Sequence, residues 1–155
     1  MKKKLLLVLT SILLGTAAVA CGKNATKKDD NVGIYEEQIS YIETSRLAAE
    51  KSTLQELKTA IKNAMCEGYE DVKATQIPVK VDSEGKIKFA SLFDTSNDGG
   101  RNFVKAIEEY MGTDCIIFSS KRKEDCSLQI VNFDIEDMKF TIKLVSEITG
   151  ENMDI

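Results

Sequence analysis

Apolar residues recur about every 3.6 positions across residues 35–68, which is the period of an amphipathic helix. The positions on this stripe are Ile39, Ile42, Ala49, Leu54, Leu57, Ile61, Ala64 and Met65. Acidic residues concentrate in the first turns and lysines in the last, as the helix dipole favours, and Gly68 provides a stop. The pattern predicts one long helix. The alternative is a kinked pair of helices, because Thr53 and Glu56 have the spacing of a capping box.

A period of two replaces the helical period across residues 76–90. Apolar residues alternate with polar ones on both sides of a turn at residues 82–85. They are Ile77, Val79 and Val81 before the turn, and Ile87 and Phe89 after it. This pattern predicts a β-hairpin in which Gly85 takes a positive φ. Pro78 lacks a backbone donor, so its strand is expected at a sheet edge.

The rest of the chain is expected to form a second helix and three strands. The second helix is expected from Gly100 to Met111. Its apolar stripe consists of Phe103, Val104, Ile107, Tyr110 and Met111. Gly112 ends it. The strands are expected at residues 115–119, 127–133 and 139–145, as a meander followed by a tail at 146–155. The fold class is therefore α+β: a long N-terminal helix and a shorter helix packed on an antiparallel sheet of about five strands.

The first twenty residues have the order of parts found in an export signal. Lysines at positions 2–4 precede an apolar run at 5–14 and a small-residue stretch at 16–20. The apolar run is too short for a standard transmembrane helix. Residues 22–34 are small, polar and charged, as in a flexible tether. The expected organisation is a signal peptide at 1–20, a tether at 21–34 and a single domain at 35–155.

The end of this leader, Ala18-Val19-Ala20-Cys21, resembles the lipobox of bacterial lipoproteins. The resemblance implies cleavage before Cys21, a diacylglyceryl group on the Cys21 sulfur and a protein held on the outer face of a cell membrane. Ala18 stands where that family more often carries Leu. The alternative is ordinary signal cleavage after Ala20 followed by secretion, because Ala18-Val19-Ala20 is also an A-x-A site.

Charge and composition exclude several classes of partner and of catalytic site. Without residues 1–20 the chain has 18 basic and 25 acidic residues, a formal charge of −7. This balance argues against a nucleic-acid partner, and against adhesion to anionic lipid beyond the anchor itself. The basic run at 121–123 is expected to be a solvated loop tip. Histidine is absent, which excludes Ser-His and Cys-His nucleophile pairs and His-ligated zinc. We therefore expect neither catalysis nor a cofactor.

Three cysteines follow Cys21 in the sequence. Cys115 and Cys126 stand at matching ends of two strands that are expected to pair. A disulfide between them would close a loop of about ten residues and contribute roughly 2–3 kcal/mol. The alternative is two buried thiols. Cys66 is expected to be a buried small hydrophobe.

Residues 94–100 form the one chemically distinctive loop. Asp94, Ser96 and Asp98 place oxygens at the first, third and fifth positions before a glycine, which resembles the opening of an EF-hand calcium loop. The twelfth position is Lys105, where a bidentate Glu belongs. Two interpretations follow: a weak calcium site, or a polar turn in which Asn97 or Asp98 caps the second helix.

The overall layout resembles the globular part of type IV pilins and pseudopilins, and residues 45–61 are similar to the exposed half of a pilin helix. The pilin leader and the apolar first half of the pilin helix are absent from this sequence. We expect a lipid-anchored, extracytoplasmic, non-catalytic domain that binds another protein of the cell envelope. The alternatives are a pilin-like or secretion-apparatus accessory role, and a calcium- or solute-binding lipoprotein.

Overall fold

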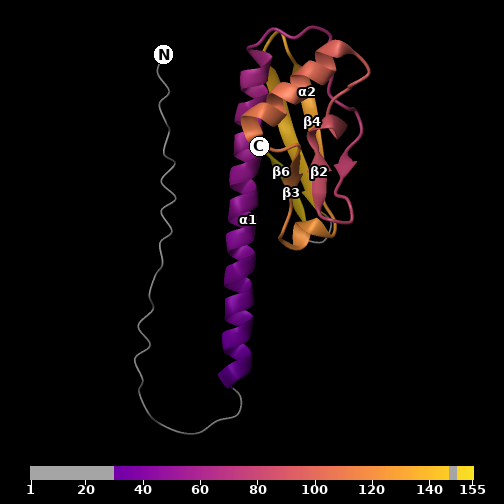
Figure 1. Ribbon diagram of the computed structural model, residues 1–155. Helices are drawn as coiled ribbons and strands as arrows, with labels where there is room; N and C mark the ends of the chain where they lie inside the picture. Colours follow the sequence, from indigo (N-terminus) through magenta and orange to yellow (C-terminus); the bar gives the residue numbers. More distant parts are fainter. Residues whose placement is uncertain (1–29, 147–149) are drawn as a thin grey trace, which may run out of the picture.

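The computed structural model describes residues 30–146 and 150–155 of the chain (Figure 1). Two α-helices accompany one four-stranded and one two-stranded antiparallel sheet, which confirms the α+β class. The elements are α1 (Asp30–Met65), β1 (Val79–Lys80), β2 (Lys86–Lys88), η1 (Phe89–Ser91), α2 (Asp98–Met111), β3 (Cys115–Ile117), η2 (Lys121–Lys123), β4 (Ser127–Asp134), β5 (Lys139–Ser146) and β6 (Glu151–Asp154).

The first helix, α1, is continuous over 36 residues, which confirms the single long helix and excludes the kinked pair. It begins at Asp30, inside the stretch expected to be a tether. At about 1.5 Å per residue it spans about 54 Å. Its second half packs on the sheet through fully buried Leu54, Leu57 and Ile61, while its first half projects beyond the rest of the domain (Figure 1). No helix within the described residues is long and apolar enough to cross a membrane.

The larger sheet has the strand order β1-β4-β5-β6. The expected tail is wrong, because residues 151–154 pair with β5 as an edge strand. Two features hold it there: the buried side chain of Ile155, and backbone hydrogen bonds of 3.2 and 2.8 Å between Ile155 and Ile142. Met153 is the only apolar residue at positions 151–154, so this stretch showed no strand pattern in the sequence.

The expected hairpin at residues 76–90 is wrong in its pairing. Its turn forms, since the Asp82 carboxylate accepts hydrogen bonds from the backbone of Glu84 and Lys86. The strands on either side enter different sheets, with β1 paired to β4 and β2 to β3. A side chain on Gly85 would lie 2.7 Å from the Phe118 carbonyl, so this turn packs directly against the segment after β3. The chain changes sheets at the turn, and β1 lies at a sheet edge, as Pro78 predicted.

The expected three-stranded meander is also wrong, because β3 pairs with β2, and of the three strands expected in it only β4 and β5 pair with each other. Within β4 the register shifts between Val131 and Asp134, and Asn132 has a φ of 53°. This β-bulge adds one residue and so turns Phe133 to the core face. There Phe133 lies 5.5 Å from Phe93 and 5.9 Å from Phe103, measured between ring centroids.

Helix α2 covers the aromatic cluster and ends as predicted at Gly112, which has a φ of 69°. Phe103, Val104 and Ile107 of its predicted stripe are buried, whereas Tyr110 is 52% exposed at the margin. The helix therefore packs through the centre of its apolar stripe and leaves one edge of it in solvent.

Candidate functional site

The disulfide predicted between Cys115 and Cys126 does not form. Cys21 lies outside the described residues. Cys115 and Cys126 are both buried, and the strand pairing on which their disulfide depended is wrong, because β3 and β4 belong to different sheets. Burial raises the pKa of the Cys115 thiol, which disfavours the reactive thiolate. Cys66 is exposed, contrary to expectation.

The loop at residues 94–100 is a capping turn for α2. The Asn97 side-chain oxygen accepts a hydrogen bond of 2.7 Å from the backbone of Gly100, as an N-cap residue does. Asp94 accepts a bond of 2.9 Å from the Ser96 backbone, which lowers the pKa of that carboxyl. Asp98 pairs with Arg101. No group of three or more metal-binding side chains occurs among the residues that the structure describes.

We expect calcium to leave the thermal stability of this domain unchanged, because the Asp94 and Asp98 carboxylates already have partners within the turn. The measurement is the melting temperature with and without millimolar calcium, for the wild type and for Asp94→Ala. A rise in the wild type that Asp94→Ala abolishes would restore the calcium interpretation of Asp94, Ser96 and Asp98.

A buried ion pair ties α1 to the segment after β3. The side chains of Glu50 and Arg122 are each only 3% exposed, and Glu50 Oε2 lies 3.2 Å from a guanidinium nitrogen of Arg122. Glu50 also accepts hydrogen bonds of 2.7 Å from the backbone of Ser119, the backbone of Ser120 and the Ser120 hydroxyl. Two turns earlier, Glu43 accepts a bond of 2.7 Å from the Lys121 backbone. Two helix carboxylates therefore hold this segment in place.

This arrangement corrects two sequence expectations. Arg122 belongs to the basic run that was expected to be a solvated loop tip, but it is buried. Glu50 is also buried, although only apolar residues were assigned to the core-facing stripe of its helix. One signal was available: Glu50 stands four positions before Leu54 and seven before Leu57, which places it on the apolar stripe. Both side chains of the pair have the burial of a structural element, so we assign it to folding rather than to binding.

A second polar cluster lies on the surface where α1 ends. The Glu67 carboxylate accepts hydrogen bonds of 2.6 Å from the Tyr69 hydroxyl and 2.8 Å from the Tyr110 hydroxyl. These bonds lower the pKa of Glu67. The bond to Glu67 raises the pKa of Tyr69 to about 12, and it raises the pKa of Tyr110 as well.

We expect a tyrosine NMR titration to show Tyr69 ionising near pH 12, and Glu67→Ala to return it toward its ordinary value of about 10. Since the folded-state pKa is the higher one, the stabilising contribution of this bond is complete below about pH 10 and is lost as pH rises through about 12. Glu109→Ala, which removes a nearby charge without removing the bond, is the control. An unchanged Tyr69 titration in Glu67→Ala would contradict the assignment.

No protein-family model, curated protein or solved structure matches this chain. The surfaces that the fold leaves open are therefore the guide to what it binds. Two of them stand out.

The first is the projecting half of α1. Its large apolar side chains are exposed by about half or more: Ile34 (52%), Tyr35 (64%), Ile39 (65%), Tyr41 (78%) and Ile42 (49%). Ile39 and Ile42 stand eighteen positions, or about five turns, before buried Leu57 and Ala60. They therefore continue the core-facing stripe into solvent. We call Tyr35, Ile39 and Ile42 the free-helix stripe.

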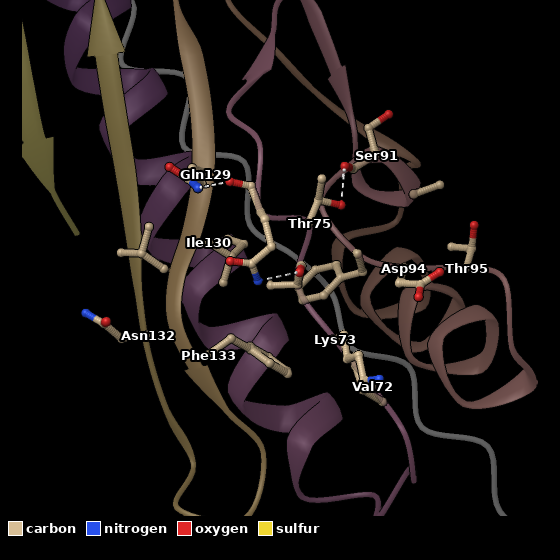
Figure 2. A pocket seen from close by; sticks show the side chains of 15 residues that line it. Val72, Lys73, Thr75, Ser91, Asp94, Thr95, Gln129, Ile130, Asn132 and Phe133 are labelled. Carbon is tan, nitrogen blue, oxygen red and sulfur yellow. Dashed lines mark hydrogen bonds between the residues drawn. The ribbon is translucent and has the colours of Figure 1, made fainter.

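The second is a groove of about 830 Å³ between two extended segments, residues 72–76 and residues 129–133 of β4 (Figure 2). Gln129 closes one end by donating a hydrogen bond of 2.7 Å to the Gln76 carbonyl. Phe93, Ile130 and Phe133 give it apolar lining. The groove could not be predicted from the sequence, because its walls come together where β1 pairs with β4, and β1 was expected to pair with β2.

Proposed function

We propose that this chain is a lipid-anchored extracytoplasmic domain that binds another protein of the bacterial cell envelope and performs no catalysis of its own. The observation that carries the proposal is the free-helix stripe, which follows the predicted anchor at Cys21 by a short distance in sequence. A helix with an exposed stripe at positions i, i+4 and i+7 has the form that docks into an apolar groove of a partner.

The charges beside the stripe favour a protein partner over a lipid surface. Glu36, Glu37 and Glu43 stand in this part of the helix, and the first basic residue after Asp30 is Arg46. An anionic membrane would repel this acidic segment. A groove rimmed with lysine or arginine would attract it and accelerate association. The partner surface is therefore expected to be apolar at its centre and basic at its rim.

The anchor is tested by the intact mass of the chain extracted from membranes of the cells that produce it. The expected mass begins at Cys21 and includes acyl groups. An unmodified chain in the medium would contradict the anchor and would redirect the search for partners to outside the cell.

The binding surface is tested with a photo-crosslinking residue at position 42 of the anchored chain. We expect one discrete adduct with an envelope protein, and at least a tenfold loss of that adduct when Ile39→Asp is added. Thr44→Asp is the matched control, because it puts the same charge on the same helix away from the stripe. Equal losses in the two variants would contradict docking through this stripe.

A pilin-like or secretion-apparatus accessory role is the second candidate. The division of α1 into a packed half and a projecting half favours it, since pilin helices are divided in this way. This role predicts that the chain copurifies with filament or export components, and that Ile39→Asp removes it from them. Purification with neither class of component would exclude it.

A further inference from the structure

The β4 wall of the groove has no strand partner on its outer side. The Val81 backbone donates a hydrogen bond of 3.0 Å to the Cys126 carbonyl, and Leu128 is the last β4 residue that β1 pairs. Backbone groups of alternate residues in a strand face the same neighbour. Ile130 therefore directs its N–H and C=O toward the groove, where no described strand pairs with them.

The opposite wall also has no strand partner on its groove side among the described residues, and its Ala74 carbonyl accepts a hydrogen bond of 3.3 Å from the Gln76 side chain. Thr75 donates a backbone hydrogen bond of 2.9 Å to the Leu92 carbonyl, and Asp94 donates one of 2.8 Å to the Lys73 carbonyl. Residues 73 and 75 thus face the segment at 92–94, and by alternation residues 74 and 76 face the groove. The Gln129–Gln76 hydrogen bond confirms this direction for Gln76, because it crosses from one wall to the other (Figure 2).

The groove has the size of one short strand. Strands in a sheet lie about 4.8 Å apart and sheets pack about 10 Å apart, so a volume of about 830 Å³ holds about 17 Å of strand, or about five residues. Charged residues and proline normally protect an exposed strand edge. Lys80 lies in β1 and Pro78 directly precedes it. Residues 129–133 of β4 contain neither, and the bulge at Asn132 interrupts this edge only near its far end.

We propose that the groove binds an extended segment of a partner polypeptide, about five residues long, which adds as a strand between β4 and residues 72–76. This inference rests on the proposed binding role and identifies a site for it. Among the lining residues the charged ones are Lys73 and Asp94, one of each sign. With Phe93 and Phe133 also in the lining, the segment that fits is uncharged, with apolar side chains at alternate positions.

The test uses the purified full-length chain and a displayed library of random seven-residue segments. We expect enriched segments whose synthetic peptides bind, and a loss of at least tenfold in affinity when one alternate set of their amides is N-methylated. Val131→Lys, which places a charge on the open edge, should also weaken binding at least tenfold. Thr141→Lys is the matched control, because Thr141 is the cross-strand partner of Val131 but does not line the groove.

Amide exchange in the wild-type chain keeps the test independent of how the variants fold. Bound peptide should slow exchange of the Ile130 amide and leave that of Ile142 unchanged. The inference is overturned if N-methylation of its amides weakens the binding of no peptide. It is also overturned if a bound peptide leaves the exchange rate of the Ile130 amide unchanged. A further measurement is the position-42 adduct in cells that produce the Val131→Lys variant. If that adduct stays intact, the groove is not the site for the partner, while the binding role through α1 stands. Loss of that adduct in Ile39→Asp alone tests the binding role separately.

Discussion

Replacing Glu50 with alanine is expected to destabilise the domain by about 3–5 kcal/mol, because it breaks the buried ion pair between the Glu50 carboxylate and the Arg122 guanidinium. The same change removes the acceptor for the Ser119 and Ser120 backbone amides. The measurement is the free energy of unfolding from urea titration. Since Glu50 and Ser120 are far apart in sequence, the loss should also loosen the contact between α1 and the segment after β3.

Glu43→Ala is the matched control for this prediction. Glu43 also accepts a backbone hydrogen bond from the same segment, but at an exposed position. A hydrogen bond to a charged group at such a site contributes at most about 1.5–3 kcal/mol, and less when water replaces it, so the control should lose clearly less stability. Equal losses from Glu50→Ala and Glu43→Ala would show that burial of the ion pair does not determine its contribution.

The sequence predicted the helices because their signals are local. The 3.6-residue stripe of α1, and the Asn97 cap and Gly112 stop of α2, depend only on residues within the same element. Strand pairing is not local. The turn at Asp82 formed as predicted, but whether the strands beside it pair with each other depends on the competing partners β3 and β4, which lie far along the chain.

The candidate surfaces were less predictable than the fold. Exposed Ile39 and buried Leu57 occupy equivalent positions on one periodic stripe, so periodicity alone could not show which half of α1 the domain covers. The groove exists because β1 pairs with β4 only as far as Leu128, and the residues that precede β1 lie apart from the rest of β4. The nearest sequence feature was Pro78. It predicted that its strand lies at a sheet edge, but not that the preceding residues separate from β4.

One of the two interpretations of the loop at residues 94–100 connected Gly99, the glycine after Asp98, with calcium, whereas the structure gives both Gly99 and Gly100 a packing role. A Cβ on Gly100 would lie 1.8 Å from the Asp94 carbonyl oxygen, and one on Gly99 would lie 1.8 Å from the Glu70 carbonyl oxygen. Real Cβ atoms do not approach backbone oxygens this closely, and neither carbonyl can rotate away as a side chain could. The start of α2 therefore packs against two loops at a distance that only glycine permits at positions 99 and 100.

Gly100→Ala is accordingly expected to destabilise the domain by roughly 1–3 kcal/mol, although alanine is the better helix former by about 1 kcal/mol. The measurement is again the free energy of unfolding, with and without calcium. Gly68→Asn is the control, since Gly68 has a φ of 77° and open space around it, and asparagine tolerates that conformation. A loss in Gly100→Ala that calcium does not alter supports close packing, because the Asp94 and Asp98 carboxylates remain in place. Unchanged stability in Gly100→Ala would mean that the loop at Asp94 can move aside, and the start of α2 would then be far less constrained than its contacts imply.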